Sequence, residues 1–371
     1  MKIGILTSSR ADFGIYLPLI RKLKKDPFFS VEIIAFGTHL SSAHGETIKQ
    51  IRAEGFEVKY TIKSLLLTDD PESISTAIGL TVVKFANFWE MHSSDFDLIF
   101  CLGDRYEMFA AVSSGIPFNL TFAHLHGGET TFGAIDNVFR HCITVASKYH
   151  FVSTESYWKR VASITGSPEN IYYVGALSLD HLQTLPLLTP EEFKERWGVD
   201  LTKRTILTTF HPETVNTADH QKQAQELIKF LKYSRDQVLI TMPNADTHGS
   251  YLRKLMVEEL RGRDHVFLIE NLGAQSYFTA MKHCAFLLGN SSSGIIEAAS
   301  FGKYVINLGD RQQGRAVSDN VLQVPIDCEA IRLAIQKIDV KGRFNGDNIY
   351  YKKQSAEQIV HILKRIASYE K

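Results

Sequence analysis

A Gly/Ser-rich turn near the end of the chain has the residue types that hold a phosphate group. It comprises Gly289-Asn290-Ser291-Ser292-Ser293-Gly294 and follows Ala285–Leu288, an apolar run that predicts a buried strand. A turn of this kind before a helix presents unpaired backbone N–H groups, which bind anions. Glu297 follows within about two helical turns, where its carboxylate could accept hydrogen bonds from ribose hydroxyls. The pattern favours a nucleotide site, although such residues are also typical of an ordinary helix start or surface turn.

Three arginines follow predicted strands and could bind phosphate oxygens. Arg10 comes directly after the first predicted strand, where a guanidinium suits bidentate phosphate binding. A surface ion pair with Asp12 is the alternative. Arg311 and Arg315 follow a later strand and could contact a phosphate or a base, or only hold their own loop in place.

Two aspartates lie where a strand or a glycine break leads into a predicted helix. Asp104 follows Leu102-Gly103, and Asp136 follows the Gly133-Ala134 break. Either residue could serve only as a helix cap. Together they could divide acid and base roles, because two carboxylates in different surroundings acquire different proton affinities.

Histidines supply the remaining proton-handling groups. His124 and His126 alternate around Leu125, so on a strand they would share one face, and with Glu129 and Asp136 they could bind zinc or manganese. Proton transfer or hydrogen bonding is the favoured interpretation, without a metal. His211 in the second half could protonate or stabilise a leaving phosphate, or only brace its loop.

The Asp95-x-Asp97 pair imitates the metal motif of many sugar transferases. It precedes its strand, so it lies at the edge of the sheet that faces away from a ligand, and a solvated cap is expected.

Short apolar strands alternate with helical patterns along the whole chain, which predicts an α/β fold with two doubly wound parallel sheets. The first half contains the longest predicted helix, Pro71–His92, and further helices at Arg105–Ser114 and Asn137–Ser147. Its predicted strands are Lys2–Thr7, Val31–Phe36, Leu98–Leu102, Leu120–Leu125 and Tyr149–Val152. After a polar segment, Thr189–Lys203, a second series of strands follows at Thr205–Thr209, Gln237–Thr241, Val266–Ile269, Ala285–Leu288 and Tyr304–Leu308.

This division predicts a Rossmann-like domain over residues 1–172, a second over 173–353, and a final helix over 354–371 that packs back on the first. Parallel sheets bind ligands outside the carboxyl ends of their strands. The polar clusters follow those ends, which predicts one cleft lined by both halves.

Composition excludes several classes of function. The 371 residues include 41 basic and 41 acidic side chains, so no broad field favours nucleic acid or an anionic membrane. The four cysteines, Cys101, Cys142, Cys284 and Cys328, are scattered, which favours a reducing compartment. No apolar run is long enough for a signal peptide or a membrane span, so a cytoplasmic protein is expected.

The ordered motifs strongly resemble those of the hydrolysing UDP-N-acetylglucosamine 2-epimerases of sialic acid biosynthesis, in particular the bacterial branch. The likeness runs from the first strand to about Arg315. It is carried by Ser9–Gly14, Gly37–Leu40, Leu102–Arg105, His124–Glu129, Ile135-Asp136, Arg140-His141, Phe210–Thr214, Asn244–Asp246, Gly289–Gly294 and Gly309–Gln312.

The resemblance implies a GT-B-like architecture and conversion of UDP-N-acetylglucosamine and water into UDP and N-acetylmannosamine, without metal or any other cofactor. It implies a homodimer or homotetramer whose partner is a UDP-sugar. The implied catalytic residues are Asp104, His126, Glu129, Asp136 and His211. The implied substrate- or UDP-binding residues are Arg10, His39, Asn244, Ser291, Ser292, Gly294, Glu297, Arg311 and Arg315.

One departure leaves the acid and base open. Animal members of the resembled family have a glutamate at the place of His126, so either His126 or the nearby Glu129 takes over its role. The expected chemistry is elimination to a glycal followed by addition of water, because the C2 proton is not beside a carbonyl. Three alternatives remain: the same reaction on a UDP-2,4-diacetamido-trideoxy sugar, a GT-B glycosyltransferase, and a sugar-nucleotide sensor without turnover.

Overall fold

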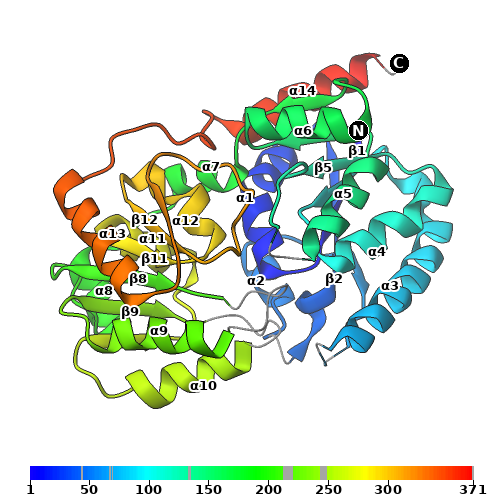
Figure 1. Ribbon diagram of the computed structural model, residues 1–371. Coiled ribbons are helices and arrows are strands. Elements are labelled where there is room, and N and C mark those ends of the chain that lie inside the picture. The colour runs from blue at the N-terminus through cyan, green and yellow to red at the C-terminus, as the bar shows by residue number, and fades with distance from the viewer. Residues whose placement is uncertain are drawn as a thin grey trace. The chain divides into compact units, whose positions relative to one another are not determined.

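The computed structural model describes residues 1–42, 45–66, 68, 70–132, 135–211, 220–242 and 249–369. The chain forms two compact units. Unit 1 comprises Met1–Glu129, Asp136–His181 and Tyr350–Lys371, and unit 2 comprises Thr130–Ile135 and Leu182–Ile349. Each unit is built around one parallel sheet (Figure 1).

The sheet of unit 1 has seven strands in the order β3-β2-β1-β4-β5-β6-β7 among the described residues. All of its strand pairs are parallel. Its strands are β1 (Lys2–Thr7), β2 (Ser30–Phe36), β3 (Tyr60–Ile62), β4 (Leu98–Leu102), β5 (Phe122–Leu125), β6 (Tyr149–Val152) and β7 (Ile171–Tyr173). Its helices are α1 (Arg10–Lys25), α2 (Ile48–Ala53), α3 (Pro71–His92), α4 (Tyr106–Gly115), α5 (Asp136–Ala146), α6 (Glu155–Thr165), α7 (Leu177–Thr184), which runs on into unit 2, and α14 (Ser355–Tyr369).

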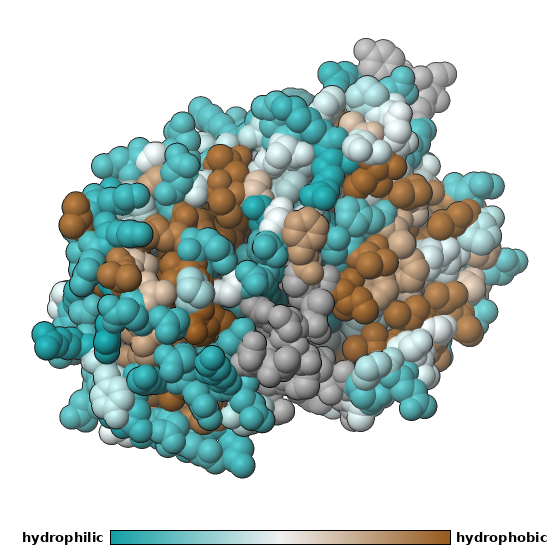
Figure 2. Space-filling model, viewed as in Figure 1, coloured by the Kyte–Doolittle hydropathy of each residue, from teal (hydrophilic) through white to brown (hydrophobic). Residues whose placement is uncertain are grey.

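Helices α3, α4 and α5 pack on one face of this sheet. Phe85, Trp89 and Met108 from these helices join strand residues in one buried cluster. The outward side of the same helices is apolar too, as Figure 2 shows. Its exposed side chains are Val83, Met91, Val138 and Val145, with Ile116 just after α4.

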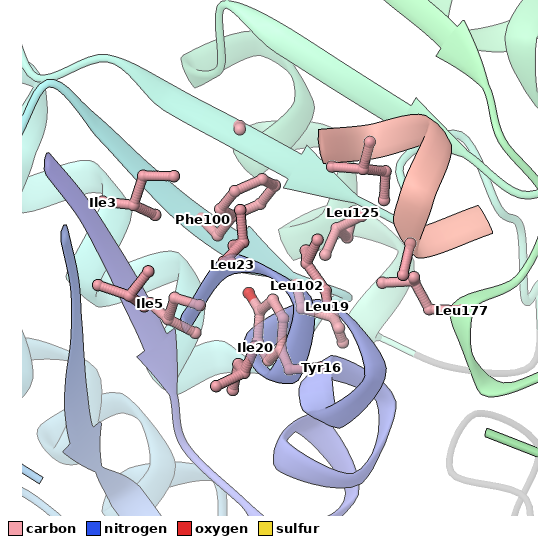
Figure 3. Packing of buried hydrophobic residues seen from close by; sticks show 14 of the residues in the cluster. Ile3, Ile5, Tyr16, Leu19, Ile20, Leu23, Phe100, Leu102, Leu125 and Leu177 are labelled. Carbon is pink, nitrogen blue, oxygen red and sulfur yellow. The ribbon is translucent and has the colours of Figure 1, made fainter. Parts of the chain in front are cut away.

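The other face of the sheet is covered by α1, α2 and α14. Ile3 and Ile5 alternate along β1 and meet Leu19 and Leu23 of α1 (Figure 3). The Asp180 carboxylate accepts hydrogen bonds from the first backbone N–H groups of α14, which caps that helix and holds it in unit 1.

The sheet of unit 2 has six strands in the order β10-β9-β8-β11-β12-β13 among the described residues, again all parallel. Its strands are β8 (Thr205–Thr209), β9 (Gln237–Thr241), β10 (Val266–Ile269), β11 (Phe286–Gly289), β12 (Val305–Leu308) and β13 (Val321–Val324). Its helices are α8 (Pro190–Trp197), α9 (His220–Lys232), α10 (Gly249–Leu260), α11 (Gly273–His283), α12 (Ser292–Ile296) and α13 (Cys328–Lys341). The predicted α/β class with two doubly wound parallel sheets is confirmed.

Among the described helices, none has the length and hydropathy that a membrane crossing requires.

Candidate active site

A charged network centred on Arg140 lies beyond the carboxyl ends of β4 and β5. Arg140 belongs to α5, and only 2% of it is exposed. Its Nη2 contacts the Asp104 carboxylate, and its Nη1 donates to Oε2 of Glu129 at 3.1 Å. The Asp104 side chain keeps 26% of its surface exposed, whereas that of Glu129 keeps 3%. One buried guanidinium therefore pairs with two carboxylates, and Asp104 is the more exposed of the two.

His126 and Glu129 form a second contact of the network. The His126 Nδ1 and the Glu129 Oε1 lie 2.7 Å apart, and Ser153 Oγ donates to the same carboxylate oxygen at 3.0 Å. His126 lies just after β5 and has a left-handed backbone with φ of 63°. This conformation is unusual for a residue with a Cβ atom and is typical of positions that the surroundings hold in place for function.

The prediction that His124 and His126 share one strand face is wrong, because β5 ends at Leu125. His124 is fully buried, with Nε2 2.9 Å from the carbonyl oxygen of Gly103 and Nδ1 3.2 Å from Thr144 Oγ1. Burial lowers its pKa to about 3. His124 is thus a core histidine, and the residues that the structure describes contain no group of three or more His, Cys, Asp or Glu placed to hold a metal ion.

The Gly127-Gly128 doublet shapes the turn that carries Glu129. A Cβ on Gly127 would lie 2.9 Å from His124 Nδ1, and one on Gly128, whose φ is 77°, would lie 2.8 Å from the carbonyl oxygen of Tyr157. The protein's own packing therefore requires both glycines.

Asp136 is the first residue of α5 and is half-buried. It precedes Arg140 by four residues, so both lie on the same face of the helix.

The turn after β1 is held by hydrogen bonds, and the exposed Arg10 follows it. Arg10 is exposed at the start of α1. The backbone N–H and the hydroxyl of Ser8 donate to Asp12 Oδ2 at 2.9 and 2.6 Å. The Asp12 carboxylate thus stabilises the turn after β1. The contact of Arg10 with a phosphate stays a prediction.

His39 has a structural environment. It is fully buried, and its Nε2 and Nδ1 lie 2.9 and 2.8 Å from the hydroxyls of Thr7 and Thr47. Burial lowers its pKa to about 4. Because both ring nitrogens already have protein partners, this geometry favours a bracing role over the predicted ligand contact.

In unit 2, the predicted phosphate turn follows β11 as expected. Gly289 has φ of 143°, and a Cβ there would lie 2.0 Å from the carbonyl oxygen of Thr209, so only glycine fits. Ser291 is the N-cap of α12, and its hydroxyl accepts from the backbone N–H of Ser293 at 3.3 Å. Ser292 begins the helix, Gly294 is buried within it, and Glu297 ends it with its side chain largely buried. The helix has only five residues, so the local N–H groups and hydroxyls matter more than a helix dipole.

Asn290 connects this turn to the end of β8. Its Oδ1 accepts from the His211 N–H and its Nδ2 donates to the His211 carbonyl, both at 2.7 Å. Arg311 Nη1 and Gln312 Nε2 donate to the Asn290 carbonyl at 3.1 and 2.8 Å. The loops after β8, β11 and β12 are thereby tied to one buried asparagine.

His211 is neutral at physiological pH in this setting. Burial, and secondarily the positive charge of Arg311, lower its pKa to about 3. The neutral ring can donate a hydrogen bond to a phosphate, and its role as a proton donor to the leaving phosphate stays a prediction.

The remaining predicted contacts divide as follows. Arg311 is half-buried and holds two loops together, and Arg315 is half-buried with its backbone N–H donating to the Gln312 carbonyl. Asn244, and the Pro212-Glu213 part of the predicted motif, lie outside the described residues.

Sequence reasoning gave no role to three residues that organise the two sites. Arg140 could have been found from its position four residues after Asp136. Asn290 lies in the turn that was singled out, and Ser153 carries no sequence signal.

The chain is similar to proteins of known name over almost its whole length. A family model described as UDP-N-acetylglucosamine 2-epimerase matches residues 21–364. A Legionella pneumophila protein named UDP-N,N'-diacetylbacillosamine 2-epimerase (hydrolyzing) is 33% identical and covers 98% of this chain and 96% of its own length. The Escherichia coli polysialic acid biosynthesis protein P7 is 32% identical, with 98% and 93% covered.

A solved structure shows the same fold. The crystal structure of UDP-GlcNAc 2-epimerase from Neisseria meningitidis bound to UDP-GlcNAc superimposes with a TM-score of 0.82 at 18% identity, covering 98% of this chain and 100% of that chain. With the two parallel sheets, this likeness confirms the predicted GT-B-like fold.

Proposed function

Because the chain belongs to the UDP-N-acetylglucosamine 2-epimerase family, we propose that it is a hydrolysing 2-epimerase. It converts UDP-N-acetylglucosamine and water into UDP and N-acetylmannosamine for sialic acid biosynthesis. The relative named for polysialic acid biosynthesis supports this product.

The observation that carries the proposal is the network at the carboxyl edge of the first sheet. Epimerisation at C2 by elimination needs one group that removes a proton and another that returns it on the opposite face. Asp104 and the His126–Glu129 pair supply such groups around Arg140, and Asp136 lies one helical turn before Arg140 on α5. A non-catalytic sensor would not need this arrangement.

In the proposed reaction, a base takes the C2 proton while the C1–O bond breaks and its electron pair leaves with UDP. A C1–C2 double bond forms, which makes the intermediate a glycal. Water then adds its oxygen to C1 and gives up one proton to a carboxylate of the site, while an acid delivers a proton to C2. Arg10 and the neutral His211 ring stabilise the charge of the departing diphosphate through hydrogen bonds.

For UDP, we propose binding at the turn after β11. The hydroxyls of Ser291 and Ser292 and the adjacent backbone N–H groups hold phosphate, and the Glu297 carboxylate holds the ribose hydroxyls. Gly294 allows close approach, while Arg311, Arg315 and Asn244 complete the contacts.

A second candidate substrate is UDP-N,N'-diacetylbacillosamine. The Legionella pneumophila relative that carries this substrate in its name supports it. Both substrates undergo the same chemistry at C1 and C2 and differ at C4 and C6 of the sugar.

The test is incubation with each UDP-sugar in heavy water, followed by mass spectrometry. A hydrolysing 2-epimerase releases UDP and a free 2-epimer with one solvent deuterium at C2. Release of UDP without deuterium at C2, or only with an added sugar acceptor, would instead support a GT-B glycosyltransferase. Full turnover after dialysis against a chelator is expected, since the proposal involves no metal.

We also propose that the protein works in the cytoplasm as a homodimer or homotetramer. Support comes from the unpaired state of all four cysteines and from the exposed apolar side chains of α3 and α5. Light scattering of the purified protein measures the mass, and a monomer at micromolar concentration would refute the oligomer.

A further inference from the structure

Both carboxylate oxygens of Glu129 accept hydrogen bonds from the protein itself. Its Oε1 accepts from His126 and Ser153, and its Oε2 accepts from Arg140. Only 3% of its side chain is exposed. A general base must come within hydrogen-bond distance of the proton that it takes, and both oxygens of this buried carboxylate are already held by protein donors.

The same contacts determine which nitrogen of His126 carries hydrogen. The Arg140 guanidinium beside it favours the ionised carboxylate of Glu129, which can only accept hydrogen bonds. The His126 Nδ1 at 2.7 Å must then be the donor. In the neutral ring, the lone pair therefore resides on Nε2.

His126 is also the more accessible member of the pair. Its side chain is 9% exposed, and it follows directly on the carboxyl end of β5, where a parallel sheet binds its ligand.

We propose that His126 Nε2 takes the C2 proton of the sugar and that Glu129 is a positioning residue that fixes the tautomer of His126. The inference rests on the proposed 2-epimerase function. The C2–H bond breaks, its electron pair forms the C1–C2 double bond, the C1–O pair leaves with UDP, and the proton adds to the Nε2 lone pair. The imidazolium so formed is stabilised by the Glu129 carboxylate.

The first test replaces Glu129 with glutamine. In Glu129→Gln, the amide carbonyl continues to accept from Arg140, and the amide N–H faces His126 Nδ1. Nδ1 must then accept, so Nε2 carries the hydrogen and cannot act as a base. We expect kcat to fall by roughly 10²- to 10⁴-fold with KM changed by less than about threefold. The matched control is Glu169→Gln, the same change at an exposed position of unit 1, and its kcat should equal that of the wild type.

A double-mutant cycle separates positioning from direct proton transfer. A carboxylate at position 126 has no tautomer to fix, so in the His126→Glu background the Glu129→Gln change should cost less than about threefold in kcat. An equal loss from Glu129→Gln in both backgrounds would show that Glu129 acts on the substrate itself, and the proposal would fail.

Ring ¹⁵N NMR of His126 tests the proposal without turnover, and it remains decisive if His126→Glu is inactive or unfolded. The wild type should show hydrogen on Nδ1, and Glu129→Gln should show it on Nε2. Hydrogen on Nε2 in the wild type would overturn the proposal. A wild type that converts neither UDP-sugar would refute the proposed function, whereas the NMR result would still decide the tautomer.

Discussion

Asn290 and His211 are joined by two hydrogen bonds of 2.7 Å that run in opposite directions, from the His211 N–H to the Asn290 side chain and from that side chain back to the His211 carbonyl. Asparagine suits this position because one side chain supplies both an acceptor and a donor. The turn expected to hold phosphate thereby also places the imidazole that follows β8.

Replacing this asparagine should affect both stability and turnover. In Asn290→Ala, the buried N–H and C=O of His211 lose their partners, so the free energy of unfolding should fall by about 2–4 kcal/mol. Turnover should fall as well, because the His211 ring is no longer held. Urea unfolding and a UDP-release assay measure the two effects. The exposed Asn271, which accepts one hydrogen bond, provides the control as Asn271→Ala, and an equal shift in both variants would contradict the role of Asn290.

Asp104→Asn should keep UDP binding and lose turnover. The amide cannot transfer the proton, and a loss of roughly 10²- to 10⁴-fold in kcat is expected for a proton-transfer residue. Arg140 keeps its contact with Glu129, so folding should survive. The control is Asp97→Asn at the opposite edge of the same sheet, where the carboxylate accepts from the Lys2 N–H at 2.7 Å. Wild-type rates for Asp104→Asn in a coupled UDP-release assay would remove it from the mechanism.

The triple change Ser291→Ala, Ser292→Ala and Glu297→Ala should weaken UDP binding. It removes two hydroxyls and one carboxylate from the proposed phosphate and ribose site, and lost hydrogen bonds to charged groups cost about 1.5–3 kcal/mol each. Calorimetric titration with UDP should therefore show at least a hundredfold loss of affinity. Glu259→Ala, whose carboxylate pairs with Lys232 elsewhere in unit 2, should bind UDP normally. Unchanged affinity in the triple variant would refute this placement.

Buried His124 should make the protein less stable in mild acid. Its folded-state pKa is lowered to about 3 from an ordinary value of 6.5, so only the unfolded chain takes up a proton in between. Its contribution to stability is full above pH 6.5 and is lost as the pH falls toward 3. At about 1.4 kcal/mol per pH unit, about 2 kcal/mol is lost by pH 5. The difference in unfolding free energy between wild type and His124→Gln should shrink by this amount between pH 7 and pH 5, and a constant difference would contradict the buried neutral ring.

Sequence periodicity predicted most elements of both sheets. Lys2–Thr7 and Pro71–His92 agree with β1 and α3 at both ends, because an apolar strand and a helix capped by Asp70 with Pro71 in its first turn are signals within the segment itself. The missed strands, β3, β7 and β13, are edge strands. An edge strand has a neighbouring strand on one side only, so more of it contacts solvent. Its sequence is therefore less uniformly apolar than that of a central strand. The missed α8 begins with a capping box of Thr189 and Glu192, a signal that its polar composition obscured.

The sequence by itself determined the α/β class and the family, since strand and helix periods and ordered motifs are local properties of the chain. It also placed Asp104, His126 and Glu129 at strand ends. Only the tertiary structure decided how they pair, because parallel pairing sets β4 beside β5 and brings residues some twenty positions apart to one edge of the sheet. The tertiary structure also places Arg140 between two carboxylates and gives both oxygens of Glu129 hydrogen-bond donors from the protein. Hydrogen-bond partners depend on distances of a few tenths of an ångström, which no spacing along a chain encodes.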